Sequence, residues 1–307
     1  MRTKKKTLIK KKSKAKNSKK KSSLRRPKGS VTSALRFVRF IGVSLGGGKT
    51  DRTALSIVDY YPDKKRLFLR SLQDKVSSKG ESLGDDQLLD ILEGEGKVQS
   101  IAFDVPLQLP KCLRCELKCP GMLNCTVDAV VWMRKAYQKR NRIKRPNKMF
   151  TPYTERVSEI YIANELEEPF HPSHALGANA APLTARAHYL GRRLKKSQTI
   201  LEVYPKLSLW RIGMDLNIPK SHLRFHRHAV DSDESRHLIL QTLVEKGIAF
   251  IYQQDLRLLI DNSTAFDSFL CALTGFLKFR KQTEEKPAGY PQGEVWIDFP
   301  VKKIIWF

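Results

Sequence analysis

The 307-residue sequence contains no long apolar run and little cysteine. A membrane-spanning helix needs about 18 or more consecutive apolar residues, and no segment approaches that length, so we expect a soluble protein. A secretory signal needs an apolar core after its basic start, but only Leu8 and Ile9 interrupt the lysines near the N-terminus. Four of the five cysteines lie within fourteen residues. This clustering argues against a disulfide scaffold and favours a reducing compartment, either the cytoplasm or the nucleoid or nucleus.

Acidic residues are missing from the first 30 positions, which hold fifteen lysines and arginines. The whole chain has 57 basic and 31 acidic residues, a formal net charge of +26, so the remainder of the chain is basic too. A segment of this composition cannot bury enough apolar surface to offset the entropy of ordering it. We therefore predict a disordered basic tail over residues 1–34, which binds nucleic acid by salt-sensitive, sequence-independent attraction to phosphates. The alternative is a solubility or targeting segment.

From residue 37 the pattern becomes that of an α/β domain, which we expect to span residues 35–307. Apolar runs and apolar spacing predict strands and helices. The strands are expected over 37–44, 53–60, 66–71, 98–104, 199–204 and 294–299, and the helices over 81–93, 232–246 and 265–279. This order indicates a mixed sheet of three antiparallel strands followed by parallel strands, flanked by helices. Residues 106–197, with the cysteine cluster and a basic helix, look like an insertion.

Three acidic residues stand where the pattern is otherwise apolar. Asp104 and Glu202 each end an apolar run, at the carboxyl ends of two expected central strands, where α/β sheets gather ligands. Asp267 lies on a segment that is apolar nearly all round, which implies a buried helix. A buried carboxylate is costly without a cation, a set of hydrogen bonds or a metal. Taken singly, the first two would be bonded to loop amides and Asp267 would cap its helix, but the three together favour a functional site.

Four segments, in their order along the chain, carry a resemblance to a known family. They are a glycine-turn strand pair (41–58), an Ile-Ala-Phe-Asp-Val-Pro-Leu segment (101–107), a Glu-Val-Tyr-Pro segment (202–205) and an Asp-Ser-Phe-Leu-Cys-Ala-Leu-Thr-Gly helix (267–275). Over about residues 37–300 the chain resembles a family of uncharacterised proteins predicted to be ribonuclease H-like nucleases. The segment from Arg156 to Glu159 resembles a further element of that family.

The resemblance implies a ribonuclease H-like sheet and a cluster of acids that holds Mg²⁺ or Mn²⁺. Asp104, Glu202 and Asp267 would be the ligands, with Glu159 as a fourth acid, and the reaction would be hydrolysis of DNA or RNA. Two-metal hydrolysis requires carboxylates that converge on ions about 3.5–4 Å apart. Related enzymes carry an Asp on the first strand where this sequence has Ser44, and a hydroxyl brings no charge to balance two divalent ions. Asp51, across the glycine turn, is a candidate replacement.

The sequence therefore leaves two main functions open: a metal-dependent nuclease and a catalytically inactive nucleic-acid-binding protein of the same fold. A third is suggested by the turn Gly46-Gly47-Gly48-Lys49-Thr50, which is similar to a nucleotide phosphate loop. That pattern requires a glycine where Val43 stands, and it leads into a helix, whereas residues 53–60 predict a strand. We interpret the turn as a hairpin, and a nucleotide-dependent phosphotransferase as the most distant alternative.

The sharpest local motif is formed by four cysteines: Cys112, Cys115, Cys119 and Cys125. Four thiolates at this spacing can close a tetrahedral site around a structural Zn²⁺. Cys119 is followed by a proline, as in some iron–sulfur motifs, so an iron–sulfur cluster is the second interpretation and four reduced thiols the third. Cys271 lies in the apolar helix and is expected to be a core residue.

A basic helix is predicted directly after the cysteines, and no acid interrupts its bases between residues 134 and 148. We expect it to contact a phosphate backbone, with Trp132 or Tyr137 available for stacking on bases. The predicted nucleic-acid-binding residues are Arg134, Lys135, Lys139, Arg140, Arg142, Lys144 and Arg145. A solvated helix face is the alternative.

Overall fold

The computed structural model describes residues 37–47, 52–143, 150–166, 170–172, 174–195, 197–228 and 230–307. Leu35–Phe307 forms one compact unit. The predicted basic tail and residues 48–51 of the glycine turn lie outside the described residues.

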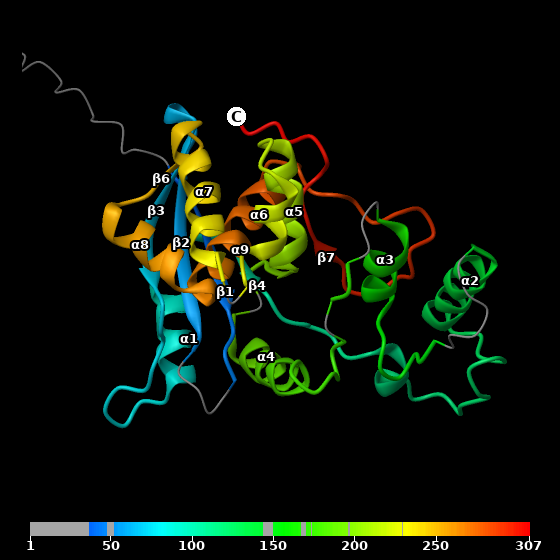
Figure 1. The fold of residues 1–307 in the computed structure, drawn as a ribbon. Helices are drawn as coiled ribbons and strands as arrows, with labels where there is room; N and C mark the ends of the chain where they lie inside the picture. The colour runs from blue at the N-terminus through cyan, green and yellow to red at the C-terminus, as the bar shows by residue number, and fades with distance from the viewer. Residues whose placement is uncertain are drawn as a thin grey trace, which may run out of the picture. The chain divides into compact units, whose positions relative to one another are not determined.

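In the part of the chain that the structure describes, seven strands form one mixed sheet with the order β6-β3-β2-β1-β4-β5-β7 (Figure 1). The strands are β1 Val38–Ser44, β2 Ala54–Tyr61, β3 Arg66–Gln73, β4 Val98–Phe103, β5 Ile200–Val203, β6 Ala249–Phe250 and β7 Ile297–Asp298. The first three pair antiparallel, and β4, β5 and β7 continue from β1 as parallel neighbours. The expected α/β class with a mixed sheet is confirmed.

Helices flank this sheet (Figure 1). They are α1 Gly84–Gly94, α2 Asp128–Ile143, α3 Val157–Glu165, α4 Ala181–Arg193, α5 Pro205–Asp215, α6 Lys220–Phe225, α7 Ser232–Glu245, α8 Gln253–Asp261 and α9 Ser263–Phe279, with short 3₁₀ turns η1 Pro62–Lys64 and η2 Lys111–Arg114. The patterns in the sequence predict α1, α2, α7 and α9, but they give no range for α3, α4, α5, α6 or α8. Helix α5 begins with Pro205, a residue favoured at a first helical position because its missing N–H would have no intrahelical acceptor.

The two faces of the sheet are covered by different helices. Apolar residues of α5, α7 and α9 form the larger core on one face, where Phe40 of β1 packs. Helices α1 and α4 cover the other face, where Leu88 and Leu190 pack with Ile41 and Phe103. Residues 106–197 are therefore divided. Helix α4 and Ile162 of α3 pack in the cores on the sheet, whereas α2 and the start of α3 form a separate small core.

Helix α9 lies directly on β1 at Gly42. A Cβ atom at this position would lie 1.9 Å from the carbonyl oxygen of Ser268, so only glycine permits so close an approach. Further along α9, Gly275 lies near Phe40, at the start of β1. The helix therefore runs antiparallel to β1, and its first turns reach the carboxyl ends of the central strands.

The first turn of α9 is capped by Asn262. Its Oδ1 accepts hydrogen bonds from the backbone N–H groups of Thr264 and Ala265, at 2.9 and 3.2 Å. These bonds satisfy two of the N–H groups that a helix start leaves unpaired. Asp267 lies beyond the cap, so the interpretation of Asp267 as a helix cap is wrong.

Candidate active site

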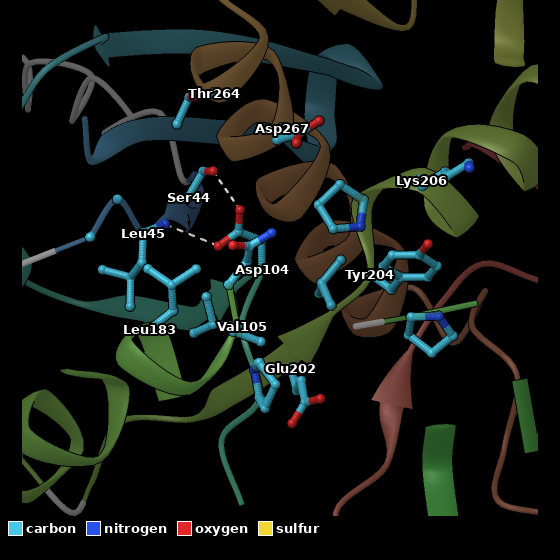
Figure 2. A pocket seen from close by; sticks show the side chains of 18 of the residues that line it. Ser44, Leu45, Asp104, Val105, Leu183, Glu202, Tyr204, Lys206, Thr264 and Asp267 are labelled. Atoms are coloured by element: carbon cyan, nitrogen blue, oxygen red, sulfur yellow. Dashed lines mark hydrogen bonds between the residues drawn. The ribbon is translucent and has the colours of Figure 1, made fainter. Parts of the chain in front are cut away.

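A pocket of about 760 Å³ opens at the carboxyl ends of β1, β4 and β5 (Figure 2). Its wall is formed by residues that follow these strands and by the first turns of α9. Asp104, Glu202 and Asp267 all line it, whereas Glu159 lines a separate small cavity. Three of the four predicted acids thus lie around one pocket, at the edge of the sheet that the sequence indicated.

Ser44 and Asp104 lie side by side on the face of the sheet that α9 covers. Val43 and Phe103 are register partners, and the next residues of both strands point to the opposite face. The Ser44 hydroxyl donates a hydrogen bond to Asp104 Oδ2, and the Leu45 N–H donates to Oδ1 at 3.0 Å (Figure 2). Burial raises the pKa of Asp104, although both hydrogen bonds oppose this shift.

Asp267 projects into the pocket from α9 and is only 2 % exposed. Its Oδ2 forms an ion pair with the guanidinium of Arg227, but its buried Oδ1 has no hydrogen-bond partner among the described residues. The same guanidinium also acts on Asp104, whose pKa its charge lowers. Arg227 is therefore a positive charge close to both carboxylates.

Cys271, one helical turn after Asp267, also lies close to Asp104. Burial raises the pKa of this thiol, and the negative charge of Asp104 raises it further. Cys271 is fully buried against the sheet, as the sequence predicted for a core residue. The packing of α9 on the sheet thus brings Asp104 and the helix face that carries Asp267 together.

Glu202 points away from Asp104. It is the register partner of Phe103, so its side chain lies on the face opposite to Asp104 (Figure 2). Two guanidinium nitrogens of Arg156 donate to its oxygens at 2.8 and 2.7 Å, and the Leu107 N–H donates to Oε2 at 2.8 Å. The charge of Glu202 is thus balanced by a buried arginine.

Glu159, on α3, is bound to the same arginine. Its Oε1 accepts from Arg156 Nε at 2.6 Å, and its Oε2 accepts from the Arg156 backbone N–H at 3.0 Å. The Ala175 N–H donates to Oε1 at 3.2 Å. Arg156 therefore joins α3 to the end of β5 through two buried carboxylates, which explains in structural terms why an arginine and a glutamate stand three residues apart.

No group of three or more His, Cys, Asp or Glu side chains in the described ranges is arranged to hold a metal ion. At the pocket, Asp104 and Asp267 are the two carboxylates on the α9 face, with the Ser44 hydroxyl beside them. Asp51, the candidate replacement for a first-strand aspartate, lies outside the described residues.

The pocket also carries positive side chains, from Arg52, Lys206 and Arg227. A fourth basic residue, Arg186 of α4, donates to the Gly46 carbonyl at the start of the glycine turn, at 2.6 Å, and pairs with Asp85. Sequence reasoning gave none of these four residues a place in the site, because they come from separate elements. Two of them stood at a recognised signal: Lys206 directly follows the Glu-Val-Tyr-Pro segment, and Arg52 lies within the glycine-turn strand pair.

The cysteine loop lies in the small core with α2 and α3. Cys112 and Cys125 pack against that core, and Cys119 is exposed. Burial raises the pKa of Cys112, and the three other thiols raise it further. Among the described residues the four cysteines are not arranged as a metal site, so the structure does not bring the predicted ligands together. Arg134 donates to the backbone carbonyls of residues 122, 123 and 125, so its guanidinium holds this loop.

Of the other predicted nucleic-acid-binding residues, Lys135 is exposed on α2. The side chains of Lys139, Arg140 and Arg142, and the whole of Lys144 and Arg145, lie outside the described part of the chain. Tyr137 is buried and donates to Glu155 at 2.6 Å, so the prediction that Tyr137 could stack on a base is wrong. Trp132 is half-buried, with its ring against Tyr290.

Comparison of the chain with models of protein families, with curated proteins and with solved structures gave no match. Among the described helices, none has the length and apolar character to span a bilayer. Any functional conclusion therefore depends on the chemistry of the pocket itself.

Proposed function

We propose that this chain is a metal-dependent nuclease of ribonuclease H-like fold, which hydrolyses phosphodiester bonds of DNA or RNA with Asp104 and Asp267 as its metal-binding carboxylates. The observation that carries the proposal is the buried Oδ1 of Asp267, a residue that lines the pocket; this oxygen has no hydrogen-bond partner among the described residues. A buried carboxylate oxygen in this state is costly unless a cation or a donor satisfies it. The sheet order, with three antiparallel strands followed by parallel ones, supports the proposed fold.

The two carboxylates suit a hard divalent cation. Mg²⁺ prefers oxygen ligands and usually takes one or two carboxylates, with waters and substrate phosphate completing its shell. When bound, such an ion lowers the pKa of the attacking water and stabilises charge on the phosphate. Arg52 and Lys206, which also line the pocket, would bind phosphate oxygens of the substrate.

Glu202 and Glu159 have a different role in this proposal. Both are buried against Arg156, and Glu202 lies on the face of the sheet opposite to Asp104. They would position the wall of the pocket by joining β5 to α3. The basic tail and the continuation of α2 would bind the nucleic-acid backbone outside the pocket, through attraction that weakens with salt.

A second function, a catalytically inactive nucleic-acid-binding protein, is favoured by one specific observation. Ser44 donates to Asp104 where a first-strand acid would stand, and Arg227 already neutralises Asp267. In this form the pocket keeps its positive side chains but binds no ion.

A cleavage assay separates the two functions. The full chain is incubated with single-stranded DNA, single-stranded RNA, duplex DNA and an RNA–DNA hybrid, with Mg²⁺ or Mn²⁺. Asp104→Asn and Asp267→Asn are compared with Asp86→Asn, a surface aspartate that pairs with Arg193. The nuclease is expected to cleave at least one substrate and to lose this activity only in the first two variants. Equal behaviour of the wild type and all three variants would rule out the enzyme, and salt-sensitive binding without cleavage would support the inactive form.

A further inference from the structure

We infer that the pocket takes a single divalent cation, held by Asp104 and Asp267, and that the guanidinium of Arg227 occupies the place of a second one. This inference rests on the proposed function and specifies how many ions the site holds. It departs from the two-ion arrangement that the family resemblance implies.

The first observation behind the single-ion inference is the position of Arg227. Its guanidinium pairs with Oδ2 of Asp267, which is 2 % exposed. The Arg227 side chain itself is 52 % exposed and lines the same pocket as Asp104 and Asp267. A positive charge thus pairs with one of the two carboxylates, in the pocket that both line, and remains open to a ligand there.

The remaining ligand atoms fit one ion. Oδ1 of Asp267 is free of hydrogen bonds among the described residues, and each Asp104 oxygen accepts one, from the Ser44 hydroxyl and the Leu45 N–H. A carboxylate oxygen has two lone pairs, so Asp104 retains capacity for a cation. Ser44 contributes no charge, and its proton is committed to Asp104.

Charge balance supports the same number. Counted without Arg52 and Lys206, the two carboxylates and Arg227 leave one negative charge, which one divalent cation and one singly charged phosphodiester bring to neutrality. A second divalent cation would add two positive charges to these groups, and Arg52 and Lys206 already make the pocket more positive with either number of ions. Uncompensated charge in a partly buried site is costly, so a single ion is favoured.

Manganese binding tests this count without relying on activity. The full chain is titrated with Mn²⁺ and followed by electron paramagnetic resonance, which gives both the number of bound ions and the spin–spin coupling of two ions at about 3.5–4 Å. We expect one uncoupled Mn²⁺ in the wild type that is lost in Asp104→Asn and in Asp267→Asn. In the double variant Ser44→Asp with Arg227→Gln, we expect a second ion and a coupled signal.

Arg193→Gln serves as the matched control, because this arginine also pairs with an aspartate, Asp86, but lies outside the pocket. It is expected to keep one ion, and circular dichroism verifies that every variant is folded. A coupled Mn²⁺ pair in the wild type would overturn the single-ion inference and leave the proposed nuclease standing. One ion in the folded double variant would overturn the assignment to Arg227. If the wild type binds no Mn²⁺, or if Asp104→Asn binds it equally well, the proposed function itself is contradicted.

Discussion

Phe103 and Glu202 are register partners in the parallel strands β4 and β5, and their side chains therefore lie on the same face of the sheet. Asp104 is the next residue along β4 and lies on the other face, with Ser44. In the sequence, Asp104 and Glu202 look equivalent, since each acid follows an apolar run of a central strand. The register alone separates them, and it directs Glu202 to Arg156 and Asp104 towards α9.

This separation predicts that Glu202 is not a metal ligand. Glu202→Gln keeps a hydrogen-bond acceptor for Arg156 and Leu107, so we expect the variant to bind Mn²⁺ as the wild type does. Asp104→Asn is expected to lose that binding, because it removes a charge from the α9 face. Isothermal titration calorimetry with Mn²⁺ compares the two variants. An equal loss in both would place Glu202 in the metal site and contradict the separation by register.

Arg156 is expected to be essential for stability, because it balances two buried carboxylates. Arg156→Met would leave Glu159 and Glu202 buried without their cation, and breaking a buried pair in this way costs about 3–5 kcal/mol. Arg193→Met removes an exposed pair with Asp86 that solvent screens, so it should change stability little. Urea unfolding of both variants measures the difference. Similar midpoints for the two would show that Arg156 does not hold the two carboxylates together.

The fold was predictable where one strand or helix has its own pattern. Apolar runs and apolar spacing predict the strands β1 to β5 and the helices α1, α7 and α9, because each of these elements is buried on one side or on all sides. Helix α5 was missed since it follows β5 without a connecting loop, and the one sign of its start is Pro205. The two-residue strand β6 is too short to show any alternation.

The candidate site was predictable where a residue departs from the local apolar pattern. Asp104 and Asp267 attract notice because each is an acid in an apolar context. Arg227 gives no such signal, since it stands among other basic residues between α6 and α7, and its pairing with Asp267 is long-range. Partners that are far apart in the chain follow from packing and register, which local sequence patterns do not encode.

The contact between α9 and β1 predicts a strict requirement for glycine at position 42. Gly42→Ala would place a methyl group 1.9 Å from the Ser268 carbonyl oxygen, which is backbone and cannot rotate away. Overpacking of this kind costs typically 1–3 kcal/mol and sometimes more, so we expect a marked fall in the urea midpoint. Gly94→Ala is the matched control, because a Cβ there meets nothing within 4 Å. If Gly42→Ala is as stable as Gly94→Ala, the close packing that positions Asp267 is not present.

The buried His226 predicts a loss of stability in mild acid. Burial, together with the charges of Arg227, Lys206 and Arg236, lowers the pKa of His226 to about 4, although its hydrogen bond to the Leu223 carbonyl opposes this shift. Between pH 6.5 and 4 the unfolded chain therefore binds a proton that the folded chain does not. The free energy of unfolding should fall as the pH is lowered through this range, by roughly 3 kcal/mol for this residue.

Urea unfolding at several pH values measures this loss. His226→Gln is expected to flatten the fall between pH 6.5 and 4, since the variant has no imidazole to protonate. His228→Gln, at an exposed position, should keep the slope of the wild type. The same slope in His226→Gln and the wild type would assign the acid sensitivity to other groups.

Zinc at the cysteine loop stays a prediction, and the surroundings of the loop make it testable. Leu113, Leu117 and Leu123 are more than half exposed, so the loop has little apolar burial to hold its shape. Arg134 donates to its carbonyl groups, and the four thiols are not arranged as a metal site in the described part of the chain, so a bound zinc would have to draw them together. We expect the purified chain to retain about one zinc, measured by plasma mass spectrometry, and Cys115→Ser to lose it.

Cys271→Ala is the control for this last experiment, because Cys271 is buried in α9 and belongs to a different core from the loop. It should keep the metal, which would assign the zinc to the loop cysteines and not to thiols in general. Iron with inorganic sulfide in the wild type would replace zinc by an iron–sulfur cluster at the same residues. A metal content that Cys115→Ser leaves unchanged would show that the four cysteines are reduced thiols, and the loop would then depend on Arg134 for its shape.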